Sequence, residues 1–305
     1  MPCRWRPVVI VITAPTGNIG HQVLDTVLTG GEPVRVIARY PARLPAGIRE
    51  RVEVVQGSHG DPQVVARAFD GADTVFWLLP PDPRAAGVHA AFAGFTAPAA
   101  EAMRRLGVAR VVDVSALGRG TPHADKAGYV TASLAMDDLI AGTGVALRAL
   151  TAAGFMDNVL RQVQPIKEQG LFFDVVSPDR PLRVVAARDI AAVAARLLLD
   201  TAWTGRAEVP LLGPEDLSYN DMAAVISEVL GTPVQYRQIP VQALEERLTG
   251  RGMSPGMVQG MVEMLEAKEK GLDDGITRTP QHATDTPTTF HQWCEDVLKP
   301  AIQAA

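Results

Sequence analysis

The amino-acid sequence predicts an α/β protein built around a doubly wound parallel sheet. Short apolar segments rich in β-branched residues alternate with helical patterns through the first half of the chain. This alternation is typical of parallel strands covered by helices on both faces. The first apolar segment leads through a glycine-containing turn into a helix, the unit that binds dinucleotides in Rossmann-like sheets. We therefore expect a Rossmann-like fold.

Composition narrows the functional classes. The chain has 305 residues, 47% of them hydrophobic, and a net charge of −5, so it can bury a large core but offers no basic surface for nucleic acid. No segment approaches the length of a membrane span, and the apolar run after Arg4 and Arg6 is too short for a secretory signal. Cys3 and Cys294 lie at opposite ends, without metal-ligand neighbours. We expect a cytoplasmic protein with a small-molecule substrate and no nucleic-acid or membrane partner.

The first half contains six expected strands, at residues 8–14, 34–38, 52–55, 74–79, 110–115 and 145–150. Apolar residues recur at helical spacing between them, as on the buried faces of amphipathic helices. Asn18 and Asp61 stand where a side chain caps a helix N-terminus. We expect residues 1–150 to form a dinucleotide-binding domain.

The alternation weakens after residue 150. Short strands are expected at 184–185 and 208–212, among helices at 190–199, 218–230, 241–248, 257–270 and 290–302. Asp189 and Ser218 are the expected caps of two of these helices. Residues 151–305 are therefore expected to form a smaller, mainly helical substrate lid, interleaved with the main sheet.

The segment VVIVITAPTGNIG, residues 8–20, predicts an anion site. Free backbone N–H groups and the positive end of the helix dipole converge at such a turn, and a dinucleotide phosphate is the expected ligand. Gly17 and Gly20 hold the last two positions of the usual three-glycine pattern, but Ala14 holds the first, and Pro15 lacks an N–H. A turn whose glycines serve packing alone is the alternative.

Arg39 indicates which dinucleotide to expect. It ends the second strand, where the adenosine ribose lies in such folds, and no acidic residue replaces it there. A guanidinium suits a 2′-phosphate, so we expect NADPH (NADP) as cofactor. Leu79 and Pro80, at the carboxyl end of the fourth strand, fall at the cofactor crevice.

Several motifs resemble one family. The segments ITAPTGNIG, VRVIARYPARL, GVARVVDVSALG, GFMDN, LSYNDMAAVISEVLGTPVQY and PTTFHQWCED occur in its order and spacing. The chain thus resembles the NmrA-like family of atypical short-chain dehydrogenases, which includes NADPH-dependent quinone reductases, over nearly its whole length. The resemblance and the turn together imply a cofactor site made of Thr13, Ala14, Thr16, Gly17, Asn18, Ile19, Arg39, Ser58, Leu79 and Pro80.

The resemblance also identifies candidate catalytic residues. Short-chain dehydrogenases use a serine, a tyrosine and a lysine four residues after the tyrosine; here Ser115 and Tyr129 match, and Ser133 stands where the lysine would be. Without that cation a phenol keeps its ordinary pKa of about 10, so Tyr129 is either a general acid or a packing aromatic. Asp137 is either a base that reaches the pocket or a helix-surface charge.

A pocket at the nicotinamide side is expected around the segment after the sixth strand. Its candidate residues are Trp77, Thr151, Phe155, Met156 and Asn158, although Thr151 and Ala152 replace the family's Arg-Pro. Three functions remain open: an NADPH-dependent reductase of a small, largely apolar carbonyl or quinone; an NADP(H)-sensing regulator with a protein partner; and a non-redox cyclase or isomerase.

Overall fold

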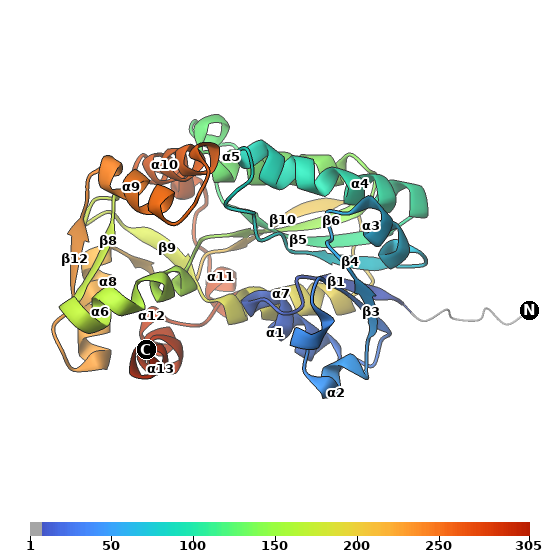
Figure 1. The fold of residues 1–305 in the computed structure, drawn as a ribbon, viewed down its shortest axis with the longest axis horizontal. Coiled ribbons are helices and arrows are strands. Elements are labelled where there is room, and N and C mark those ends of the chain that lie inside the picture. Colours follow the sequence, from blue (N-terminus) through green and yellow to red (C-terminus); the bar gives the residue numbers. More distant parts are fainter. Residues whose placement is uncertain (1–7) are drawn as a thin grey trace, which may run out of the picture.

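The computed structural model describes residues 8–305, so Cys3, Arg4 and Arg6 lie outside the described residues. Its centre is a seven-stranded, wholly parallel sheet with the order β10-β6-β5-β4-β1-β2-β3 (Figure 1). The strands are β1 (Ile10–Thr13), β2 (Val34–Ala38), β3 (Glu53–Gln56), β4 (Thr74–Trp77), β5 (Arg110–Ala116), β6 (Ala146–Ala152) and β10 (Arg206–Leu211). The predicted doubly wound α/β fold is therefore confirmed.

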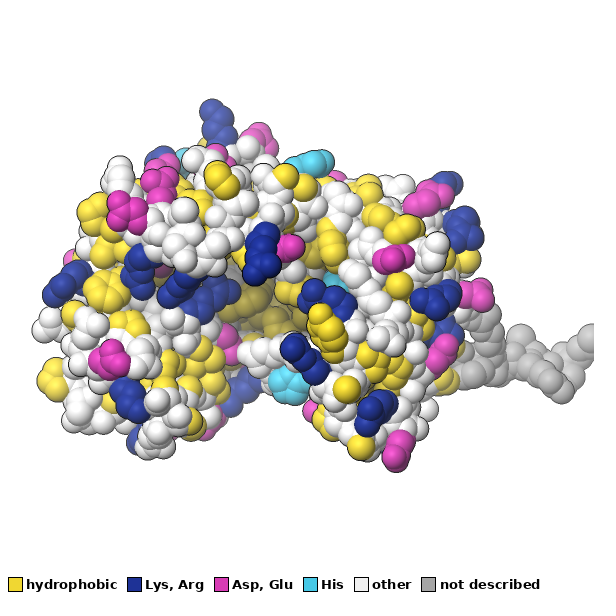
Figure 2. Space-filling model, in the orientation of Figure 1, with side chains coloured by type: hydrophobic (Ala, Val, Ile, Leu, Met, Phe, Trp, Pro, Cys, Tyr) yellow, Lys and Arg dark blue, Asp and Glu magenta, His cyan; other side chains and the backbone are white. Residues whose placement is uncertain are grey.

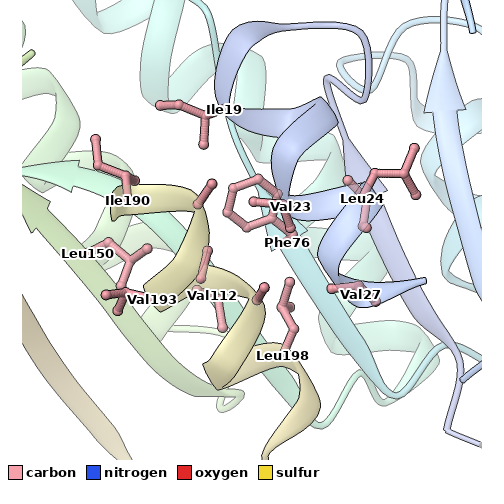
Figure 3. Packing of buried hydrophobic residues seen from close by; sticks show 14 of the residues in the cluster. Ile19, Val23, Leu24, Val27, Phe76, Val112, Leu150, Ile190, Val193 and Leu198 are labelled. Carbon is pink, nitrogen blue, oxygen red and sulfur yellow. The ribbon is translucent and has the colours of Figure 1, made fainter. Parts of the chain in front are cut away.

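Helices cover both faces of this sheet. One face carries α1 (Asn18–Val27) and α7 (Ala187–Leu199); the other carries α3 (Pro62–Phe69), α4 (Phe95–Leu106) and α5 (Tyr129–Ala141). Figure 3 shows the first interface, where apolar side chains of α1 and α7 meet above those of three strands: Ile19, Val23, Leu24 and Val27; Ile190, Val193 and Leu198; and Phe76, Val112 and Leu150. Because β10 and α7 belong to the second half of the sequence, that half completes both the sheet and its cover.

Much of the rest of the second half packs around its own apolar cluster, which holds residues from between Met156 and Leu298. It contains a three-stranded sheet of β7 (Gly154–Phe155), β9 (Leu182–Val185) and β11 (Asp216–Leu217), and a parallel pair of β8 (Leu171–Asp174) and β12 (Gln235–Gln238). The helices there are α6 (Val163–Gln169), α8 (Tyr219–Leu230), α9 (Val241–Gly250), α10 (Pro255–Glu269), α11 (Pro280–Asp285), α12 (Phe290–Trp293) and α13 (Lys299–Ala304). Between residues 8 and 305, none of the helices has the length and apolar character needed to cross a bilayer.

Two of the four predicted caps are wrong. Asp61 and Ser218 cap α3 and α8 as expected. Asn18, however, is the first residue of α1, and Gly17 occupies the N-cap position. Asp189 lies inside the first turn of α7, whose N-cap is Ala186, and its carboxylate accepts hydrogen bonds from Thr288 instead. Both side chains instead form hydrogen bonds with residues distant in sequence, Asp157 and Thr288, which a local pattern does not reveal.

Candidate functional site

The turn between β1 and α1 presents backbone to solvent at the carboxyl edge of the sheet. Thr16, Gly17 and Asn18 are exposed there. Helix α1 has no side-chain cap on its N-terminus, so its first N–H groups can bond a phosphate. These features fit the pyrophosphate of a dinucleotide.

Ala14 and Gly20 shape this turn. Ala14, at the first glycine position, is the only non-glycine residue with a positive φ in the described chain, at 49°. Its carbonyl oxygen lies against the helix, where a Cβ on Gly20 would come within 2.1 Å of it. The last glycine is therefore required for the strand and helix to approach each other, while alanine in the left-handed region is a tolerated strain.

The strands beside the turn hold other predicted cofactor residues. The buried hydroxyl of Thr13 donates to the carbonyl oxygens of Phe76 and Leu78 and accepts from the Leu78 N–H. Thr13 thus joins β1 to β4, and Ile19 is buried in the core beneath the turn. At the end of β4, Leu79 is buried and Pro80 is exposed.

Arg39 lies at the exposed end of β2, where it makes no hydrogen bond or ion pair with another described residue. His59 lies close enough for the Arg39 charge to act on it, although burial is the larger cause that lowers the pKa of His59 to about 4. The His59 ring packs edge-on against Trp77 and Phe95, and it stays neutral near pH 7. Ser58, beside it, accepts a hydrogen bond from the Gly60 N–H.

Three of the four predicted catalytic residues meet between β5 and α5. The Ser115 hydroxyl donates to Asp137 Oδ2 over 2.5 Å and lies 3.5 Å from the Ser133 hydroxyl. Tyr129, Ser133 and Asp137 are spaced one helical turn apart, so they share one face of α5. Asp137 is fully buried, which places it under the serine rather than on the helix surface.

A second carboxyl group, that of Asp113, lies next to this cluster. Asp113 lies two residues before Ser115 on β5, on the same face of the strand, and is fully buried. Its carboxyl group acts on the pKa of Asp137, and both of its oxygens and Asp137 Oδ1 are buried without another hydrogen-bond partner among the described residues. Burial raises the pKa of Asp137 to about 6 and that of Asp113 well above its ordinary range, with the neighbouring Asp137 carboxylate as the second cause for Asp113. The two carboxyl groups therefore share a proton at neutral pH.

Tyr129 begins α5 and is half-buried. Its ring packs edge-on against Phe92, and its hydroxyl makes no hydrogen bond within residues 8–305. Burial raises the pKa of the phenol, and the charge of Arg161 opposes that shift. The phenol is therefore fully protonated near pH 7 and can only donate a proton.

Helix α10 covers the start of α5. A Cβ on Gly128, whose φ is 49°, would lie 2.0 Å from the carbonyl oxygen of Gly260, and a Cβ on Gly260 would lie 3.4 Å from the Tyr129 ring. The second half of the chain thus contacts the start of α5 through a pair of glycines. Figure 2 shows the hollow between the two halves, with hydrophobic side chains on its floor and lysine or arginine side chains at its rim.

The predicted pocket residues are divided between core and surface. Trp77 and Thr151 are buried in the sheet, with the Trp77 indole donating to Thr96, and Met156 is buried in the core of the second half. Phe155 is partly exposed and Asn158 is exposed. Of this set, Phe155 and Asn158 are the side chains that a ligand can reach without displacing the core.

Sequence reasoning missed three residues of this region. Asp157 accepts a hydrogen bond from the Asn18 amide at 2.6 Å and another from the Ala187 N–H, so it ties α1 to α7. Arg161 places its charge near Tyr129. Asp113 alternates with Ser115 along β5, and that period of two was the available signal.

A family model described as NAD(P)H-binding matches residues 15–201, and one described as the NmrA-like family matches residues 145–294. The (4-alkanoyl-5-oxo-2,5-dihydrofuran-3-yl)methyl phosphate reductase of Streptomyces griseus is 29% identical over 93% of this chain and 96% of its own. The NAD(P)H azoreductase of Xenophilus azovorans is 25% identical over 94% and 96%.

A solved structure agrees in fold. The NADPH-dependent quinone oxidoreductase of Escherichia coli, crystallised with NADPH, superposes with a TM-score of 0.77 at 20% identity, covering 97% of this chain and 99% of that one. The exposed turn, the parallel sheet and the family models agree with one another. The chain belongs to the NAD(P)H-binding family, and its resemblance to the NmrA-like proteins is confirmed.

Proposed function

We propose that this protein is a cytoplasmic NADPH-dependent oxidoreductase that reduces a small, largely apolar carbonyl or quinone. The observation that carries the proposal is the Ser115 hydroxyl, held at the carboxyl end of β5 by a buried carboxyl group. That carboxyl group, Asp137, lies on the helix that Tyr129 begins. Two relatives that match nearly the whole chain, those of Streptomyces griseus and Xenophilus azovorans, are reductases by name.

Different residues of the chain would bind the cofactor, orient the substrate and supply the proton. The N–H groups of α1 hold the cofactor's phosphates, and Arg39 holds the 2′-phosphate. NADPH, when bound, supplies the hydride. Ser115 orients the substrate oxygen, and Tyr129 gives it a proton. Asp137 fixes the serine in place.

The test is oxidation of NADPH, followed by nicotinamide absorbance, against a panel of quinones and carbonyl compounds. Turnover that requires NADPH supports the proposal. Tight NADPH binding without turnover would favour a sensing regulator with a protein partner, and no dinucleotide binding would favour a non-redox cyclase or isomerase.

We expect Arg39→Asp to remove the preference for NADPH. The variant loses charge-assisted hydrogen bonds to the 2′-phosphate and adds a repelling carboxylate, so the Kd for NADPH should rise about 10–100-fold while that for NADH changes little. The matched control is Arg43→Asp, because Arg43 packs over the Tyr40 ring at 5.0 Å. Equal affinity of the unmodified protein for NADPH and NADH would contradict the prediction.

A further inference from the structure

Asp113 and Asp137 form a buried pair of carboxyl groups, and one of them is the hydrogen-bond partner of Ser115. Both side chains are 0% exposed. Asp137 Oδ2 accepts the Ser115 hydroxyl at 2.5 Å. Both oxygens of Asp113 and Oδ1 of Asp137 are buried without a hydrogen-bond partner among the described residues. The two carboxyl groups act on each other's pKa, and a proton held between them would give these oxygens a partner.

The surrounding charges do not neutralise the pair completely. Arg119 lies 3.6 Å from Asp137 Oδ2. The same guanidinium binds Glu208 at 2.6 Å and Asp138 at 3.2 Å, and Arg206 binds Asp138 at 2.7 Å. The positive charges of the two arginines are thus already balanced by two carboxylates. Because little positive charge is left for the buried pair, it carries at most one negative charge.

Hydrogen-bond direction then depends on how many protons the pair holds. With one shared proton, Asp137 Oδ2 can only accept, so the Ser115 hydroxyl must point at it. Ser115 then offers the substrate a lone pair. With a second proton, Asp137 can donate to the Ser115 oxygen, and the serine's own proton becomes free to point at a carbonyl oxygen.

We propose that the Asp113–Asp137 pair sets the direction of the Ser115 hydroxyl and so decides whether Ser115 donates a hydrogen bond to the substrate. The inference rests on the proposed reduction. It makes Asp113 and Asp137 positioning residues that act through Ser115. Because the pKa of Asp137 is raised to about 6, the second proton binds as the pH falls through that value.

The experiment is the pH profile of kcat at saturating NADPH, for the wild type and three variants. Wild-type kcat should rise about 10-fold or more as the pH falls through about 6, since one well-placed donor to the substrate oxygen is worth at least that much. Asp137→Asn should lose this inflection, because its amide does not titrate.

Two substitutions of Asp113 form a matched pair. Asp113→Asn keeps a donor to Asp137, so the inflection should stay near that of the wild type. Asp113→Leu has a similar size but removes the carboxyl group that lowers the Asp137 pKa, so the inflection should move up by about one pH unit or more. An inflection that persists in Asp137→Asn, or that fails to move in Asp113→Leu, would overturn the inference.

A measurement without substrate separates this inference from the proposed function. Infrared spectroscopy of the wild type should show the carbonyl stretch of one buried protonated carboxyl group at pH 7 and of a second at pH 5, and Asp137→Asn should lack the second. Absence of the first band at pH 7 would overturn the paired proton even in an active reductase. Both bands in a protein that reduces no carbonyl would overturn the proposed function and Ser115's role in it.

Discussion

Replacing Tyr129 by phenylalanine is expected to lower kcat for carbonyl reduction about 10²–10⁴-fold, the contribution of a positioned general acid. The phenol is half-buried and protonated, and it lies on the helix face that also carries Ser133 and Asp137. Only the hydroxyl is removed, so the edge-on contact with Phe92 is kept. The Kd for NADPH and the free energy of unfolding should change little.

The measurement is single-turnover reduction with saturating NADPH, which isolates the chemical step from product release. Tyr40→Phe is the matched control, because Tyr40 is exposed after β2. Wild-type turnover by Tyr129→Phe would exclude the phenol as the acid and leave the proton to be delivered by solvent or by Ser115.

Gly20→Ala is expected to lower the free energy of unfolding by about 2–4 kcal/mol and to weaken dinucleotide binding. The added methyl group would lie 2.1 Å from the Ala14 carbonyl oxygen and 2.8 Å from its carbonyl carbon. These are backbone atoms, so α1 must move away from β1. That displacement also shifts the N–H groups that face the phosphates.

Gly17→Ala is the control for the turn. Its φ is −84°, and its Cβ would make an ordinary contact, 3.4 Å from the same oxygen. Urea unfolding should therefore show a large loss for Gly20→Ala and a small one for Gly17→Ala, although both can weaken NADPH binding. Equal stability of the two variants would mean that the strand and helix can separate without cost.

Much of the fold could be predicted from local pattern. Residues 34–38 were expected as a strand and form β2 with the same bounds, because a run of β-branched residues between helices leaves few alternatives. Asn18 and Asp189 were wrong as caps because Asp157 and Thr288 bind them. Hydrogen bonds to residues so distant in sequence cannot be predicted from the few residues around a helix start.

The candidate site was only partly predictable. The helical spacing of Tyr129, Ser133 and Asp137 gave one face of α5, and the family resemblance supplied Ser115. Whether Asp137 faced solvent or the serine depended on which side of α5 packs on β5, and the sequence does not give that side. Asp113 was assigned to the strand, but nothing in the sequence showed that it would be buried beside Asp137. Trp77 as a pocket wall depended on the face of β4, and the structure buries it against α3 and α4.

Burial of the Asp113–Asp137 pair also makes folding a proton-binding reaction. In the unfolded chain both carboxyl groups titrate near pH 4, whereas the folded chain holds their pKa values higher. The stability that the pair contributes is complete below about pH 4 and is lost as the pH rises through the folded values. Over that interval, each pH unit lowers the free energy of unfolding by about 1.4 kcal/mol per proton. Folding of this pair near pH 7 therefore draws a proton from the buffer, and the pair contributes more stability in weak acid than in alkali.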